Sequence, residues 1–81
     1  MKANETYRTS DFTETCYMLS NGARLLDAER EADGSRVTFV FADRSACEKL
    51  AADLAFGRDQ VSATRFMDAL RQARKIIRAA V

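Results

Sequence analysis

The sequence predicts one α+β domain: a short N-terminal strand, a helix, an antiparallel β-hairpin and two C-terminal helices packed on one face of a three-stranded sheet. Apolar residues recur at helical spacing after residue 11, the pattern becomes extended between residues 24 and 41, and helical spacing returns from residue 45. Because 81 residues are too few to enclose a second core, residues 1–81 are expected to form a single domain.

The first helix is expected at residues 11–21. Phe12, Cys16 and Leu19 lie at helical spacing along this segment. Asn21-Gly22 then supplies the residue types that end helices in the left-handed conformation. A short helix with one apolar side is therefore predicted.

The stretch YRTSDF before this helix combines aromatic, cationic, hydroxyl and carboxylate side chains, as a small polar site would. Its parts also have structural interpretations. Thr9 or Ser10 is expected to cap the helix, and Asp11 to lie in the first turn, where the helix dipole favours a carboxylate. Tyr7 and Arg8 would then lie on an edge strand, where they either form an interaction surface or, for Tyr7, cover the core with the hydroxyl in water.

A hairpin is predicted around Asp33-Gly34, which separates two extended runs at residues 24–31 and 36–41. We expect a type I′ turn here, which requires positive φ at both central residues. The second run is apolar on both faces, and such strands usually lie in the middle of a sheet. The N-terminal run at residues 5–8 is therefore expected to pair with the free edge of the second run.

Capping residues for a second helix are offered by Asp43-Arg44-Ser45, and Ser45 and Glu48 have the spacing of a capping box. The helix should run to about Phe56 and stop at Gly57. Its inward-facing side chains lie at i, i+3, i+4 and i+7 and are Cys47, Leu50, Ala51 and Leu54.

The last helix is expected after Ser62 as the N-cap, with Val61 and Phe66 placed for a hydrophobic staple. Its apolar face comprises Phe66, Ala69, Leu70, Ala73, Ile76, Ile77 and Ala80. The opposite face carries the cations Arg71, Arg74, Lys75 and Arg78. Since only residues 57–60 connect the last two helices, we expect these helices to lie roughly antiparallel.

The composition argues against catalysis and metal binding. The chain has no histidine, so the usual general base and the commonest metal ligand are both missing. Cys16 and Cys47 lie far apart, which excludes a zinc knuckle or a CxxC motif within one chain. A disulfide between them is possible but is not expected in a reducing compartment, so buried, inert thiols are predicted. No catalytic residue, metal or cofactor is predicted. Since no segment resembles a membrane span or a secretory signal, a cytoplasmic location is expected.

The basic side of the last helix is the one concentrated charge in the sequence. Residues 58–81 hold six Lys/Arg against two Asp/Glu, although the net charge of the chain is +1. Arg71, Arg74, Lys75 and Arg78 could bind nucleic-acid phosphates. The alternative is the solvated face of an ordinary amphipathic helix, near whose C-terminus the dipole favours cations. No aromatic residue interleaves the four cations, so base stacking is not supported.

A protein-interaction module, most simply a homodimer, is the function that the sequence favours, because a small core gains from a second copy. The acidic body and the basic last helix could also attract each other between copies. Alanines that allow close helix approach, within or between chains, are Ala51, Ala52, Ala55, Ala69, Ala73 and Ala80. The alternative is a monomer in which all these faces pack within the chain.

The chain also resembles a small family of bacterial and phage-associated domains of unknown function. The resemblance lies in YRTSDF near the start, in the Gly-ended first helix, in VTFVF followed by Asp43-Arg44, and in the Ala-Leu-Arg sequence of the last helix. It covers nearly the whole chain. It implies a bacterial or mobile-element origin, and it implies no activity and no catalytic residue.

Overall fold

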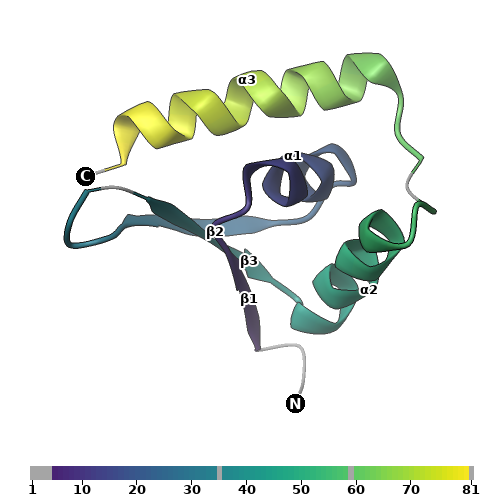
Figure 1. Ribbon diagram of the computed structural model, residues 1–81, viewed down its shortest axis with the longest axis horizontal. Helices are drawn as coiled ribbons and strands as arrows, with labels where there is room; N and C mark the ends of the chain where they lie inside the picture. The colour runs from purple at the N-terminus through teal and green to yellow at the C-terminus, as the bar shows by residue number, and fades with distance from the viewer. Residues whose placement is uncertain (1–4, 35, 59, 81) are drawn as a thin grey trace.

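The computed structural model describes residues 5–34, 36–58 and 60–80 and confirms the predicted α+β fold. Three antiparallel strands form one sheet, and three helices accompany it (Figure 1). In chain order the elements are β1 (Thr6–Thr9), α1 (Phe12–Ser20), β2 (Leu25–Arg30), β3 (Val37–Ala42), α2 (Arg44–Ala55) and α3 (Ala63–Ala79).

The sheet has the predicted strand order, β1-β3-β2. β1 pairs with β3 so that Tyr7 lies opposite Phe41, and β2 pairs with β3 so that Arg30 lies opposite Val37. The central position of β3 explains its apolar composition, because both of its edges and its helix-facing side chains are covered. Phe39 and Phe41 are accordingly 1% and 0% exposed.

The hairpin between β2 and β3 is confirmed, whereas the predicted type I′ turn is wrong. Gly34 has φ +75° and donates its N–H to the Glu31 carbonyl at 2.8 Å, and the Glu31 N–H reaches the Arg36 carbonyl at 2.8 Å. Among the described residues other than glycine, only Asp43 has positive φ, so Asp33 does not adopt the conformation of a type I′ turn. In the described part of this loop the left-handed region is occupied by Gly34 and not by Asp33, which avoids the steric cost at Asp33.

β2 contains a bulge that the alternating pattern did not reveal. Leu25 pairs with Phe41 and Asp27 pairs with Val40, so Leu26 is the extra residue. Leu26 is 47% exposed. Bulges on edge strands interrupt the ladder and disfavour pairing with a further strand, and this edge of the sheet is therefore unsuited to extension.

The N-terminus of α1 differs from the prediction by one or two residues. Asp11, not Thr9 or Ser10, is the N-cap, and its carboxylate accepts the Glu14 N–H at 2.8 Å. The Thr9 hydroxyl accepts the Asp11 N–H at 3.1 Å and so supports the cap from outside the helix. The predicted end is confirmed, because α1 stops at Ser20 and Gly22 has φ +80°.

The predicted Ser45–Glu48 capping box in α2 is also wrong. Asp43 is the N-cap, in the left-handed region with φ 63°, and its side chain accepts the Ala46 N–H at 3.3 Å. The helix therefore begins at Arg44, and Glu48 lies beyond the third helical position that a capping box requires. The predicted end of α2 near Gly57 and the Ser62 N-cap of α3 are confirmed.

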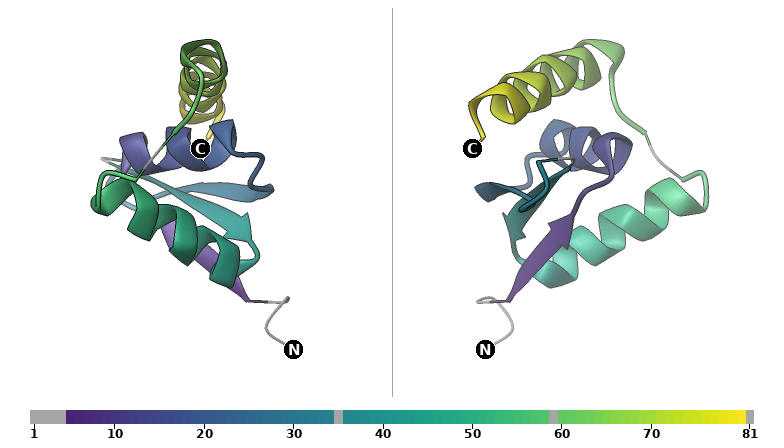
Figure 2. Two further views of the ribbon diagram at one scale, coloured as in Figure 1. Left: turned by 90° about the vertical axis from the view of Figure 1, so that its right-hand side faces the viewer. Right: turned by 60° about the vertical axis from the view of Figure 1, so that its left-hand side comes forward.

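α1 lies between the other two helices, as the two views of Figure 2 show. α3 packs on α1, while α2 packs on α1, β1 and β3. α2 and α3 make few contacts with each other, and each of them packs on α1 instead. The core on the helix-facing side of β3 is formed by Met18, Val37, Phe39, Phe41 and Cys47.

Arg30 joins β2 to the C-terminal end of α3. Its guanidinium donates to the Ile77 carbonyl at 2.8 Å and to the Ala80 carbonyl at 3.3 Å, and also to the Gly34 carbonyl at 3.1 Å. A cation at a helix C-terminus satisfies carbonyls that have no intrahelical partner. Arg30 thereby fixes where α3 ends relative to the hairpin.

Candidate interaction surfaces

The four predicted cations of α3 lie on its exposed side and together form the basic stripe, namely Arg71, Arg74, Lys75 and Arg78. With Gln72 they line a hollow of about 540 Å³. The opposite side of α3 carries Ala69 and Ala73, which are buried. Those small side chains let α3 approach α1 closely, and the long cationic side chains consequently extend outward.

The walls of this hollow come from one helix only. Small-molecule sites are usually concave pockets built by several elements and lined mostly by apolar groups. Long Arg and Lys side chains on a single convex helix do not hold a fixed shape of that kind. The basic stripe is therefore suited to an extended anionic surface and not to a compact ligand.

The basic stripe has little counter-charge within the chain. Asp68 is the one acidic residue of α3, and it pairs with Arg71 at 3.0 Å. No ion pair to Arg74, Lys75 or Arg78 occurs in the part of the chain that the structure describes. These cations are available to an external anion.

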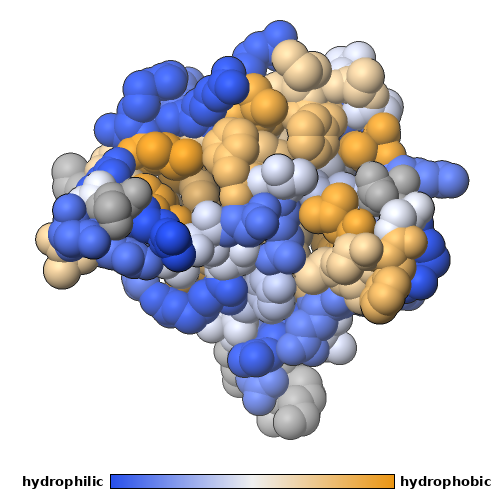
Figure 3. Space-filling model, viewed as in Figure 1, coloured by the Kyte–Doolittle hydropathy of each residue, from blue (hydrophilic) through white to orange (hydrophobic). Residues whose placement is uncertain are grey.

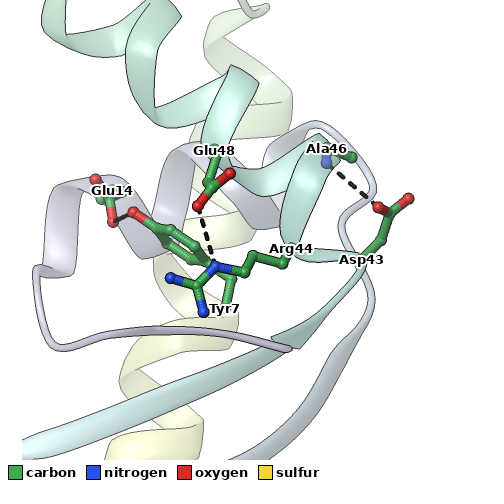
Figure 4. A network of polar contacts seen from close by, with 6 residues as sticks. All are labelled: Tyr7, Glu14, Asp43, Arg44, Ala46 and Glu48. Carbon is green, nitrogen blue, oxygen red and sulfur yellow. Dashed lines mark hydrogen bonds and ion pairs between the residues drawn. The ribbon is translucent and has the colours of Figure 1, made fainter. Parts of the chain in front are cut away.

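Tyr7 is used within the chain. Its hydroxyl donates to a Glu14 carboxylate oxygen at 2.9 Å, which ties β1 to α1 (Figure 4). Burial of the ring, the hydrogen bond and the nearby Glu14 charge together raise the pKa of Tyr7 to about 12. Its ring packs against the core, as one of the two sequence interpretations expected, but the hydroxyl is directed at Glu14.

Arg8 forms an ion pair with Glu29 across the sheet. Since Arg8 belongs to β1 and Glu29 to β2, the pair spans the central strand β3. It passes over the face that carries Val40, which pairs with Arg8 and is buried. Tyr7 and Arg8 thus point to different neighbours, and the structure does not bring them together as one site.

A third polar contact lies beside Tyr7, at the start of α2. Arg44 binds Glu48 at 3.0 Å, and this hydrogen bond with the Glu48 charge raises the pKa of Arg44 (Figure 4). Both side chains are exposed, and an exposed i,i+4 pair stabilises a helix by only about 0.3–0.5 kcal/mol.

Cys16 and Cys47 are free and buried. Burial raises the pKa of both thiols, although the nearby Arg74 charge partly opposes the effect at Cys16. Thiols with raised pKa carry little thiolate at neutral pH and react slowly. Within the described residues, no group of three or more Cys, Asp or Glu side chains lies close enough to hold a metal ion.

Exposed and partly exposed apolar side chains remain at the end of α2, in the connection and in the N-terminal half of α3, and the sequence pattern did not reveal them. We call these six residues together the apolar surface: Leu54, Phe56, Val61, Phe66, Met67 and Leu70. Phe56 is 73% exposed and Met67 47%, and the other four side chains are partly exposed. On the face seen in Figure 3, hydrophobic atoms gather over α3 and α1 and again near the end of α2, beside hydrophilic atoms over the C-terminal half of α3.

Part of the apolar surface was expected to be core. Leu54, Phe66 and Leu70 follow the inward periodicity of their helices, yet none of them packs against the central cluster. They are only partly covered, because α2 and α3 diverge around α1. Arg58 stands 5.3 Å from the centre of the Phe56 ring and pairs with Asp53 at 3.3 Å, so a cation borders this surface.

No helix in the described ranges is long and apolar enough to cross a membrane. No curated protein and no solved structure matches the chain. A family model does match, and it covers residues 4–79, which include every strand and helix described above. The chain therefore belongs to the DUF5659 family, a domain of unknown function.

Proposed function

We propose that this domain is a non-enzymatic protein-interaction module that forms a homodimer through the apolar surface. The observation that supports the proposal is the exposure of Phe56 and Met67 beside four partly exposed apolar side chains. Contiguous exposed apolar groups rimmed by polar residues are typical of protein contact sites. A bacterial or phage origin and a cytoplasmic location stay predictions.

The energetics are consistent with a dimer of moderate affinity. Full burial of a Phe or Met side chain contributes about 1.5–3 kcal/mol. Association must offset an estimated cost of about 4–15 kcal/mol in translational and rotational freedom. The burial of two exposed and four partly exposed side chains on each copy can offset an association cost in the lower part of that range.

Two features of the chain support the non-enzymatic part of this proposal. The chain has no histidine, and both of its thiols are buried with raised pKa. Each of these properties removes a common nucleophile or general base. The proposal therefore assigns the exposed groups to binding.

Sedimentation velocity over a wide range of protein concentration tests the homodimer. We expect a reversible monomer–dimer equilibrium that Phe56→Ser and Met67→Ser shift toward the monomer. Leu26→Ser is the matched control, because Leu26 is as exposed as Met67 but lies on β2. A wild-type chain that stays monomeric, or an equal effect of all three substitutions, would contradict the proposal.

The second candidate function is nucleic-acid binding by the basic stripe. It is supported by the exposure of all four cations and by the lack of ion pairs to Arg74, Lys75 and Arg78 among the described residues. The two candidates use different parts of α3, since Phe66, Met67 and the apolar surface lie near its N-terminal end. One chain can therefore carry both.

A further inference from the structure

We infer that α3 binds double-stranded nucleic acid along the basic stripe, as a projecting helix that contacts phosphates at the major groove. The inference rests on the second candidate function and specifies the form of nucleic acid that the stripe fits. The proposed contacts position α3 on the sugar-phosphate backbone and do not read the base sequence.

The placement of α3 allows this contact. The helix lies along one rim of a flat molecule, whose extents are 34 × 34 × 19 Å, and it packs on α1 (Figures 1 and 2). The four cations on its outward side are exposed. An α-helix with side chains is about 10–12 Å wide, and the major groove of B-DNA is about 12 Å wide. A rim helix on a thin domain can approach such a groove without a clash from the rest of the chain.

The spacing of the cations matches a duplex. Arg71 and Arg78 are separated by seven residues, which corresponds to about 10.5 Å along the helix axis. A duplex carries one negative charge per about 1.7 Å of its axis, or about six charges over that length. Over the length of the stripe, the duplex therefore offers at least one phosphate to each of the four cations.

The charge distribution favours an external anion over a second copy. Several carboxylates already have partners within the chain: Glu14 binds Tyr7, Glu29 binds Arg8, Glu48 binds Arg44, and Asp53 binds Arg58. Two more, Asp11 and Asp43, cap helices. Helix-dipole compensation explains only Arg78, since that residue alone of the stripe lies in the last turn. Arg71 pairs with Asp68, whereas Arg74 and Lys75 have no ion pair among the described residues, and a polyanionic partner would supply one.

A duplex also fits better than a single strand. Proteins that bind single strands combine a basic groove with exposed aromatic rings on which bases stack. The basic stripe lies on one helix and has no aromatic member. The strongly exposed ring of Phe56 lies at the end of α2 and is covered on one side by Arg58. The structure therefore offers phosphate contacts without a stacking platform.

Fluorescence anisotropy with a random-sequence duplex DNA, and with each of its strands alone, tests the inference across a series of salt concentrations. For up to four phosphate contacts by a single stripe, we expect log K to fall with log[salt] with a slope of about −3 to −4. Arg74→Gln and Arg78→Gln should each make the slope shallower by about 1. Arg44→Gln is the control, because Arg44 is an exposed arginine on α2 and should leave the slope unchanged.

Each contrary result has a distinct meaning. Tighter binding of the single strands would overturn the duplex inference and leave nucleic-acid binding standing. Absence of salt-dependent binding to either form would overturn both. Equally tight binding of poly-glutamate would replace nucleic acid by an acidic protein as the partner. None of these results bears on the homodimer, whose test is the sedimentation of Phe56 and Met67 variants.

Discussion

At the scale of single residues, the structure assigns the capping of α1 and α2 to residues close to the expected ones. The prediction placed the α1 cap at Thr9 or Ser10, and the structure places it at Asp11. For α2 the sequence offered capping residues from Asp43 to Ser45 and a capping box at Ser45 and Glu48, and the structure places the cap at Asp43. Asp, Ser and Thr all accept a backbone N–H, so composition alone does not choose among adjacent candidates. YRTSDF accordingly contributes a cap, a core ring and a cross-sheet ion pair, each directed at a different neighbour.

Tyr7 makes stability depend on pH in the alkaline range. Its pKa is about 12 in the fold and 10.0 ordinarily, so the folded state favours the protonated phenol. The stabilisation is therefore complete below about pH 10 and is lost as the pH rises toward 12. Tyr7→Phe should cost about 1 kcal/mol at neutral pH and remove this part of the pH dependence.

Urea denaturation of the two proteins at a series of pH values measures the difference. Tyr17→Phe is the control, because Tyr17 is buried and has no hydroxyl contact to Glu14. Parallel stability curves for wild type and Tyr7→Phe between pH 10 and 12 would show that the Tyr7–Glu14 hydrogen bond is not formed in solution.

At the scale of elements, the strands and helices follow from the sequence, and their mutual packing does not. α3 shows this most clearly. The sequence identified its apolar face, yet Ala69 and Ala73 are the residues of α3 that are fully buried, because the helix packs mainly on α1. The C-terminal end is held differently, through the Arg30 guanidinium on β2.

Arg30→Gln should loosen the last turn of α3. The substitution removes donors to Ile77 and Ala80, and hydrogen bonds from a charged donor contribute about 1.5–3 kcal/mol each at most. We expect faster amide hydrogen exchange in the last turns of α3, with little change near Phe66. Arg36→Gln is the matched control, since Arg36 is also an arginine of the hairpin but has no hydrogen bond to α3. Uniformly faster exchange along α3 would mean that Arg30 acts on global stability and does not hold the helix end.

At the scale of the whole molecule, the two proposed surfaces would act together. A homodimer formed through the apolar surface carries two basic stripes. If both contact one duplex, the number of neutralised phosphates rises, and the dependence on salt becomes steeper.

The combined variant Phe56→Ser/Met67→Ser tests this coupling. We expect its salt slope for duplex DNA to be about half that of the wild-type dimer, because only one stripe remains per complex. Circular dichroism provides the control for folding. Equal slopes for the two proteins would show that association and nucleic-acid binding are independent.

The sequence by itself determined the order of the elements, the central position of β3 and the basic stripe. Each depends on local spacing or on the composition of a single segment, which are properties of the chain before it folds. The tertiary structure alone decided the divergence of α2 and α3, the exposure of Leu54, Phe66 and Leu70, and the contact of Arg30 with α3. These features depend on how helices cross and on which side chains they cover, and a periodic pattern marks a face as apolar without showing what will cover it.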